Sequence, residues 1–311
     1  MRVYLFILIT IFAIVGANAQ DSVFGTSLIV LGTLQDGGSP HAGCTKECCQ
    51  ALFEHPDVNR QVVCLGLYDG KNNRRYLLEA TPDLPRQMKA LKNFGAANSR
   101  EMADGIFLTH AHIGHYTGLI YLGKEATDAH EVPVYAMPRM TEYLSANGPW
   151  SQLVERRNIT LQPLQRDIPV SLSSELRVTP FLVPHRDEFS ETVGYLIEGP
   201  HKRALFIPDI DKWEKWDRDI VEEIKKVDYA FLDATFFSGE EINQRDITQI
   251  PHPFIIESMK KFEPLEESEK QKIIFIHFNH TNPVIDPELD AAKLVLKSGF
   301  RLATINEVFA L

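Results

Sequence analysis

Apolar runs alternate along the chain with amphipathic stretches, and this pattern predicts a mixed α/β protein. Short runs rich in Val, Ile and Leu predict strands at residues 27–32, 61–68, 75–80, 105–109, 132–136, 176–183, 192–197, 204–207, 229–232 and 272–277. Apolar residues at helical spacing predict helices at residues 84–93, 115–122, 139–147, 213–226, 253–262 and 287–297. The early strands lie close together and the later ones alternate with helices, so we expect two packed mixed sheets with helices outside.

Residues 1–19 have the pattern of a secretory signal peptide. A basic start at Arg2 is followed by an apolar core and by the small-residue pattern Ala17-Asn18-Ala19. We therefore expect an exported protein, periplasmic or secreted, whose mature chain forms one domain over residues 20–311. No later stretch reaches the roughly 20 apolar residues of a membrane span, which predicts no stable membrane insertion after cleavage.

The charge of the chain argues against a nucleic-acid partner. The formal net charge is −10, and the Lys and Arg residues are scattered along the chain. A phosphate backbone is held mainly by Lys and Arg, so we expect a small-molecule substrate instead. Nothing in the pattern specifies an oligomeric state.

Three histidines lie within six residues directly after an apolar run. They are His110, His112 and His115, in Phe-Leu-Thr-His-Ala-His-Ile-Gly-His-Tyr from 107 to 116. Residues i and i+2 leaving a strand point the same way, and a turn into the following helix brings i+5 back towards them. Neutral imidazoles suit zinc or iron. The motif therefore predicts a metal site where a strand meets a helix.

Further candidate ligands follow the later predicted strands. They are His185, Asp209, Asp211, His277 and His280. Rigid scaffolds often display active-site groups at strand ends. Taken singly, each residue also has a structural interpretation, such as a helix N-cap ahead of Trp213 for either Asp. Their joint order after the histidine-rich loop favours a shared centre.

This order of residues resembles the metallo-β-lactamase superfamily over nearly the whole mature chain. The first motif of that superfamily, His-x-His-x-Asp-His, reads His110-Ala-His112-Ile-Gly114-His115 here, and later motifs resemble Pro184-His185-Arg186, residues 206–211 and Phe275-Ile276-His277. Within the superfamily the chain is similar to the pyrroloquinoline quinone biosynthesis protein B family through Leu31-Gly32-Thr33, Asp36-Gly37-Gly38, Gly43-Cys44 and Thr281-Asn282-Pro283. The resemblance implies an α/β fold of the four-layer αββα type, with two mixed sheets.

The resemblance also implies a centre with two metal positions. His110, His112 and His185 would hold the first ion. His115, Asp209 and His277 would hold the second, with Asp209 bridging. Gly114 stands where the family has a carboxylate, and the missing carboxylate weakens metal binding at the second position. The alternatives are a centre with one ion and a second position completed by Asp211 or water. Zinc is the expected metal, with iron or manganese as alternatives.

Metal-dependent hydrolysis is the activity that the resemblance implies. A bound divalent cation can lower the pKa of water to about 7 and polarise a substrate oxygen, and we expect a small ester, phosphodiester or lactone-like substrate. Asp209 and His252 are the candidate catalytic residues. His252 would act as an acid or contact the substrate; alternatively, it is a surface cap between two prolines. Two other functions stay open: an iron-dependent oxygenase linked to quinone cofactor biosynthesis, and a metal-binding protein without turnover.

The four cysteines allow two interpretations. Export favours disulfides, although adjacent cysteines bridge each other poorly. A similar family, the cyclic phosphodiesterases of phosphonate breakdown, implies instead a structural zinc held here by Cys44, Cys48, Cys49 and His280. Cys64 lies inside an apolar run and is predicted to be a buried apolar residue.

Other polar residues are interpreted structurally. Asp36-Gly37-Gly38 predicts a turn, with a contact to a substrate phosphate as the alternative. Tyr195 in an alternating strand is expected in the core. The remaining histidines in polar loops are expected to be solvent-exposed, namely His41, His55, His130 and His201.

Overall fold

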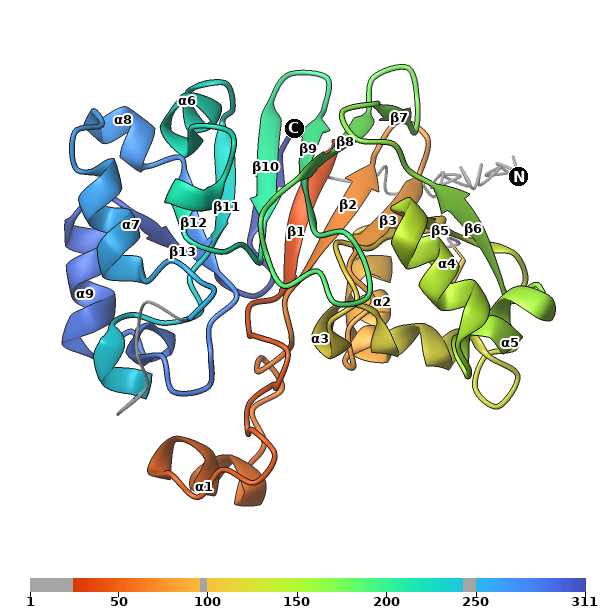
Figure 1. Ribbon diagram of the computed structural model, residues 1–311, viewed down its shortest axis with the longest axis horizontal. Coiled ribbons are helices and arrows are strands. Elements are labelled where there is room, and N and C mark those ends of the chain that lie inside the picture. The colour runs from red at the N-terminus through yellow and green to blue at the C-terminus, as the bar shows by residue number, and fades with distance from the viewer. Residues whose placement is uncertain (1–24, 96–99, 243–249) are drawn as a thin grey trace, which may run out of the picture.

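The computed structural model describes residues 25–95, 100–242 and 250–311. The expected signal peptide, residues 1–19, lies outside this part of the chain. The described residues form two seven-stranded sheets packed face to face. Figure 1 shows a group of helices at each outer side of the sheet pair. This arrangement confirms the predicted four-layer αββα sandwich.

The first sheet carries the N-terminal half of the chain and one C-terminal strand. Its order is β14-β1-β2-β3-β4-β5-β6. Antiparallel pairing joins β14 through β3, and parallel pairing joins β3 through β6. The strands are β1 Ser27–Gly32, β2 Cys64–Asp69, β3 Arg74–Leu78, β4 Gly105–Phe107, β5 Val132–Ala136, β6 Ile159–Pro163 and β14 Val308–Ala310.

The second sheet carries the C-terminal half in the order β13-β12-β11-β10-β9-β8-β7. Strands β10 to β13 run parallel, whereas β7 to β10 form an antiparallel meander. The strands are β7 Val170–Ser171, β8 Arg177–Leu182, β9 Val193–Glu198, β10 Arg203–Ile207, β11 Tyr229–Asp233, β12 Ile273–Ile276 and β13 Arg301–Leu302. The parallel strands bring their carboxyl ends to one edge, where the later candidate ligands lie.

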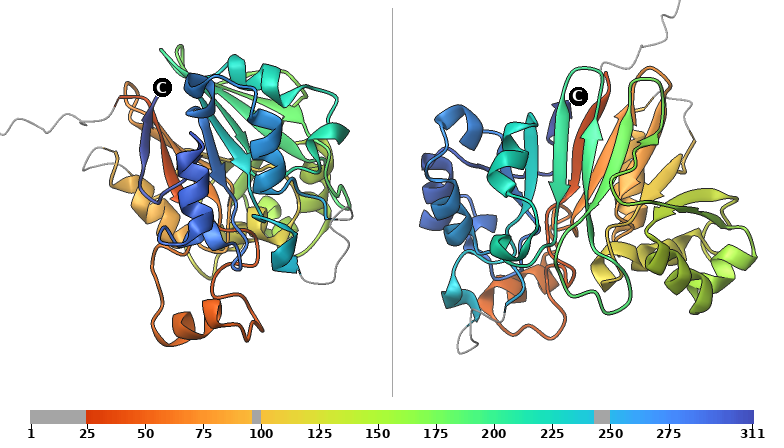
Figure 2. Two further views of the ribbon diagram at one scale, coloured as in Figure 1. Left: turned by 90° about the vertical axis from the view of Figure 1, so that its left-hand side faces the viewer. Right: turned by 45° about the horizontal axis from the view of Figure 1, so that its top comes forward.

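Helices cover the outer face of each sheet, as Figure 2 shows from two further directions. The first half contributes α1 Glu47–Glu54, α2 Leu84–Lys92, α3 Ile113–Tyr116, α4 Pro138–Ala146, α5 Trp150–Glu155 and the 3₁₀ helix η1 Thr117–Leu122. The second half contributes α6 Ile220–Lys225, α7 Ile255–Phe262, α8 Glu267–Lys270, α9 Asp290–Lys297 and the 3₁₀ helices η2 Trp213–Lys215, η3 Gly239–Ile242 and η5 Pro283–Ile285. None of the helices described has the length and hydrophobicity to cross a bilayer.

Three apolar clusters follow from this layering. The central cluster lies between the sheets and includes Leu28 and Leu65 of the first and Phe206 and Ile274 of the second. The other two lie between each sheet and its helices. Because the central strands are covered on both faces, their sequences are apolar runs with little alternation. Tyr195 belongs to the central cluster, which confirms the prediction of a core residue.

The predicted elements match the structure best where apolar runs are long. The prediction missed α1, α5 and α8 and the four short strands β6, β7, β13 and β14. Those strands are edges or neighbours of edges, where a strand needs few apolar residues. The helix expected over 213–226 is instead split into η2 and α6, with Asp219 capping α6 by accepting a hydrogen bond from Val221 N at 2.9 Å.

Candidate metal centre

The candidate ligands come from loops that leave one edge of the sheet pair. His110 and His112 follow β4, and His115 lies in α3. The end of β4 is held in place because Leu108 N donates to Tyr135 O at 3.0 Å and Glu79 N donates to Phe107 O at 2.8 Å. The side chain of His110 is 1% exposed and that of His115 is fully buried. The histidine-rich loop therefore points into the protein.

Three further groups arrive from the second sheet. His185 follows β8, Asp209 follows β10 and His277 follows β12. Strands β10 and β12 both run parallel to β11, so their ends meet at the same edge. His277 has a backbone φ of +72°, an uncommon conformation for a residue with a side chain. Such backbone strain is typical of functional sites.

Oδ2 of Asp209 is the centre of the first group. It lies 3.3 Å from His110 Nε2 and 3.3 Å from His185 Nε2. Nδ1 of His112 lies 4.0 Å from the same oxygen and 2.8 Å from His110 Nε2. The donor atoms of these four residues all lie within 4.8 Å of one another. They are the residues that the sequence assigned to the first metal position, together with the bridging Asp.

The second group contains a residue that the sequence did not assign. His115, Asp209 and His277 lie together as predicted, and Asp36 completes the set. Oδ1 of Asp36 lies 3.1 Å from His115 Nε2 and 3.2 Å from His277 Nε2. Oδ2 of Asp209 is 3.8 Å from His115 Nε2, so this oxygen faces both groups. Asp209 thus belongs to both groups, and its bridging role stays a prediction.

The donor sets fit divalent metal ions. A tetrahedral ion with ligand bonds of about 2.0–2.1 Å separates its ligand atoms by roughly 3.3 Å, close to the spacing found around Asp209. Both ring nitrogens of His185 are buried without a hydrogen-bond partner among the described residues. Buried polar atoms normally have partners, so these atoms point to a ligand.

Other side chains hold the far nitrogens of four of the histidines. Thr109 Oγ1 lies 2.9 Å from His110 Nδ1, and Thr235 Oγ1 lies 2.8 Å from His277 Nδ1. Glu188 Oε2 lies 3.0 Å from His112 Nε2, and Glu79 Oε1 lies 3.1 Å from His115 Nδ1. Such contacts orient metal-binding imidazoles and fix which nitrogen is free to bind.

Glu79 ties two of these histidines together. Its carboxylate is fully buried and also accepts a hydrogen bond of 2.6 Å from Thr109 Oγ1. The residue follows β3 and has a φ of +90°. A non-glycine residue in this region costs on the order of 1–3 kcal/mol. The fold therefore tolerates strain at Glu79 in order to place a carboxylate behind the histidine-rich loop.

His252 lies at the same centre from the loop before α7. Its Nδ1 is 2.8 Å from Asp233 Oδ2 and 3.1 Å from Asp209 Oδ1. Burial disfavours the charged ring, but the Asp233 and Asp209 carboxylates raise the pKa of His252 to about 10. The structure thus places His252 beside the candidate ligands, and not as a surface cap.

The carboxylates at the centre are strongly stabilised as anions. Burial acts to raise the pKa of Asp209, but the neighbouring His185 and His252 rings lower it well below its ordinary value. Burial likewise opposes the anion of Asp36, and the charge of His115 lowers its pKa well below the usual range. Ionised carboxylates are the form that binds a cation.

Asp211, an alternative ligand for the second position, lies elsewhere. Its Oδ2 accepts from Lys215 Nζ at 2.7 Å, and it belongs to neither donor group. The Asp36-Gly37-Gly38 segment does form a turn, with Gly38 N donating to Gln35 O at 2.9 Å. The predicted turn is thus confirmed, but the sequence did not predict that the Asp36 carboxylate also reaches the centre.

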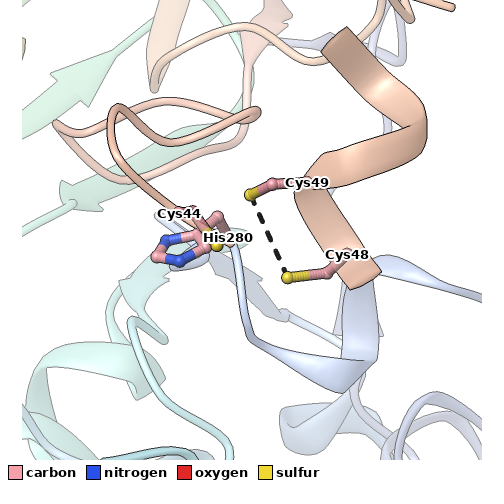
Figure 3. Close-up of side chains that lie close together, drawn as sticks. All are labelled: Cys44, Cys48, Cys49 and His280. Carbon is pink, nitrogen blue, oxygen red and sulfur yellow. Dashed lines mark hydrogen bonds between the residues drawn. The ribbon is translucent and has the colours of Figure 1, made fainter. Parts of the chain in front are cut away.

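A second cluster contains Cys44, Cys48, Cys49 and His280. Figure 3 shows Cys48 and Cys49 projecting from α1 toward Cys44 and His280. Their donor atoms lie within 4.8 Å of one another. All four cysteines of the chain are free thiols. Cys64 is fully buried in β2, as predicted.

His41 departs from the exposed position expected for it. Its ring stacks on the ring of His280 with centroids 4.4 Å apart, and its backbone N–H lies 3.3 Å from Cys49 Sγ. The exposed positions expected for His55, His130 and His201 are confirmed. His41 therefore joins the cysteine cluster to the loop that carries Asp36.

Comparisons with known proteins match most of the chain. Residues 74–278 match the model of the beta-lactamase superfamily domain. Coenzyme PQQ synthesis protein B of Xanthomonas axonopodis pv. citri is 25% identical over 304 residues, covering 89% of this chain and 97% of that protein.

Two crystal structures are similar in fold. Zn²⁺-bound PqqB from Methylobacterium extorquens has a TM-score of 0.76 and 21% identity, covering 92% of this chain and all of that one. A diphosphatase of the PhnP family has a TM-score of 0.63 and 22% identity, covering 91% of this chain and 96% of that one. At these identities the two structures support the αββα fold.

Proposed function

Because the chain belongs to the beta-lactamase superfamily, we propose that it is a metal-dependent hydrolase of a small ester, phosphodiester or lactone-like substrate. One observation carries the proposal. Imidazole and carboxylate donors from separate loops converge on Asp209, which belongs to all three overlapping donor groups at this centre. When bound there, divalent cations would lower the pKa of a water molecule to about 7 and polarise a substrate oxygen.

His110, His112, His185 and Asp209 would hold one ion of this centre. His115, His277, Asp36 and Asp209 would hold the other. Zinc suits mixed imidazole and carboxylate ligands, and iron or manganese remain alternatives for the same donors. Buried carboxylates and hydroxyls behind the rings keep the metal-facing nitrogens in place, and in this way prepare the site before substrate binds.

His252 would supply a proton to the leaving group. Its Nδ1 is occupied by Asp233, which leaves Nε2 as the nitrogen for substrate. A positioned proton donor contributes typically 10²–10⁴-fold to a rate. Asp233 in turn keeps the ring oriented and charged. Its own Oδ1 is held by Thr235, whose N–H and hydroxyl donate at 2.9 and 2.7 Å.

The proposal is tested by metal analysis and a hydrolysis panel on the purified mature chain. We expect replacement of His110 and His112 by Ala to remove bound metal and abolish hydrolysis. His130→Ala is the matched control, because the His130 side chain is 80% exposed and distant from the centre in sequence. Wild-type metal content and hydrolysis after replacement of His110 and His112 would rule the proposal out.

An iron-dependent role in quinone cofactor synthesis is the second candidate. The similarity to coenzyme PQQ synthesis protein B over 89% of the chain favours it. Purification without oxygen, followed by metal quantification and oxygen-uptake assays, separates the two functions. Iron with oxygen uptake and no hydrolysis supports the second candidate, and zinc with hydrolysis supports the first.

Two further properties belong to the proposal. The signal-like residues 1–19 support export, and the mature chain would then act outside the cytosol. The cysteine cluster would hold a structural zinc ion, since three thiolates and one imidazole make a closed tetrahedral set. Its support is the approach of Cys44, Cys48, Cys49 and His280 within ligand distance of one another.

A further inference from the structure

Gly114 occupies a special place in the histidine-rich loop. The resemblance to the superfamily expects a carboxylate at this position, and the chain has no side chain there. In the structure, the space above Gly114 is filled by another residue. A Cβ atom built on Gly114 would lie only 2.4 Å from Cα and 2.9 Å from Cγ of Asp36. Glycine at position 114 thus allows the Asp36 segment to pack directly on the loop.

Asp36 brings to this space the group that the loop lacks. Oδ1 of its carboxylate faces Nε2 of both His115 and His277, at 3.1 and 3.2 Å. Its Oδ2 lies 3.4 Å from the backbone N of Gly114. The side chain is 11% exposed, so the carboxylate is directed inward. His115 Nε2 also lies 3.8 Å from Asp209 Oδ2, and Asp36 and His277 belong to the same donor group as these two residues.

The backbone just before Asp36 is fixed to the segment that carries His277. Gln35 N donates to Phe278 O at 2.9 Å, and Phe278 N donates to Thr33 O at 2.8 Å. Leu34 forms bridges to both Val62 and Phe278. Asp36 and His277 are therefore placed as a pair by a small piece of sheet. A chance approach of a loop carboxylate would lack this support.

We propose that Asp36 is a metal ligand that replaces the carboxylate missing at Gly114, so that the second metal position is complete. The inference rests on the proposed function, because it assumes that metal binds at the centre. The inference predicts that residues 36 and 114 act together: Asp36 binds the ion, and Gly114 leaves the space that Asp36 needs.

Two variants test the two halves of this inference. Asp36→Asn keeps the shape of the side chain and removes its charge. Gly114→Ala removes no donor atom but would push the Asp36 segment away, because the added methyl group meets backbone. Asp217→Asn and Gly25→Ala are matched controls: the Asp217 side chain is 63% exposed, and a Cβ on Gly25 meets nothing within 4 Å.

The readout is metal bound per chain at buffered free zinc, with circular dichroism as the check on folding. Removing a residue that only hydrogen-bonds a ligand weakens metal binding by roughly 10–100-fold. We expect Asp36→Asn to weaken one zinc equivalent by more than roughly 100-fold, and Gly114→Ala to weaken the same equivalent. Both controls should retain wild-type binding.

Retention of that zinc equivalent by folded Asp36→Asn would overturn the inference, and so would a wild-type centre that binds one ion only. Failure of the proposed function gives a different result, since His110→Ala would then leave the metal content of the wild-type chain unchanged. If Asp36→Asn does not fold, Gly114→Ala alone decides: wild-type zinc content in that variant rejects the inference.

Discussion

Asp233 Oδ2 lies 2.8 Å from Nδ1 of His252, and both side chains are buried at the edge where the parallel strands end. The pair links a strand end to the loop before α7. The pair gives the centre an acid, His252, that lies in a different segment of the chain from the proposed metal ligands. The proposed mechanism depends on this contact for protonation of the leaving group.

We expect Asp233→Asn to lower kcat by about 10²-fold on substrates with alkyl leaving groups, since these need a proton. The loss should be smaller for a nitrophenyl leaving group, which departs as a stable anion. Removing the carboxylate lowers the pKa of His252, so the alkaline limb of the kcat/KM profile should move to lower pH. Steady-state kinetics across pH measure both effects.

The double variant of Asp233→Asn with His252→Gln is the control for this pair. Residues that act as a unit give losses that do not add, so the double variant should be no slower than His252→Gln alone. Equal losses for both leaving groups, with an unchanged pH profile, would contradict the role of His252 as an acid.

Metal removal is expected to destabilise the fold. The ring nitrogens of His185 have no hydrogen-bond partner among the described residues, and a buried unpaired polar group costs about 1–3 kcal/mol. A ligand at 100 times its Kd adds about 2.7 kcal/mol of stability. Calorimetry after chelation, with and without added zinc, should show a higher Tm with zinc. The same Tm in both samples would argue against a metal centre.

Glu79→Gln should weaken both stability and metal binding. The Thr109 hydroxyl and His115 Nδ1 both contact Oε1, and the backbone N–H of Thr109 donates to Oε2. The amide cannot accept hydrogen bonds with both of its terminal atoms, so at least one of these donors loses its acceptor. We expect a loss of about 1–3 kcal/mol in the free energy of unfolding of the metal-free chain and roughly 10–100-fold weaker zinc binding. Urea denaturation and zinc titration measure these. Glu175→Gln, at a side chain that is 45% exposed, is the control.

Cysteine reactivity should report on the cysteine cluster. Partial burial acts to raise the pKa of Cys44, but a hydrogen bond from the backbone N–H of Lys46 lowers that pKa. Burial raises the pKa of Cys64 well above its ordinary value. Iodoacetamide mapping of the chelated native protein should therefore label Cys44 and the exposed Cys48, and leave Cys64 unlabelled.

Zinc should protect Cys44 and Cys48 from this labelling, and His280→Ala should reduce the protection. Labelling that is unchanged by zinc would reject the structural zinc site. Disulfide-linked peptides from the exported protein would favour the alternative that the sequence left open.

The sequence was sufficient to predict which distant residues meet in the site where the ends of strands carry histidine. The motif at 110–115, His185, Asp209 and His277 were found because a His or Asp directly after an apolar run is conspicuous. The structure also brings His252 beside them. The order of these residues along the chain, and not any one of them, carried the resemblance that implied the four-layer fold.

Three carboxylates were missed for physical reasons. Glu79 directly follows the buried strand β3, and Asp233 ends the buried strand β11. This is the same signal that identified Asp209, but each of the two is a single acid inside an apolar stretch. Asp36 lies before two glycines, a pattern typical of turns. Its approach to Gly114 depends on the packing of two loops far apart in sequence, which periodicity does not report.

The short segment from His277 to His280 joins the two clusters, since its first residue faces Asp36 and its last lies with the cysteines. An insertion or deletion here would misalign both clusters at once. The excursion through α1, by contrast, lies at the periphery, extending away from the sheets in Figure 1. Natural variants of this protein should therefore change length in the loop after α1, which carries no residue of either cluster, far more readily than between these two histidines.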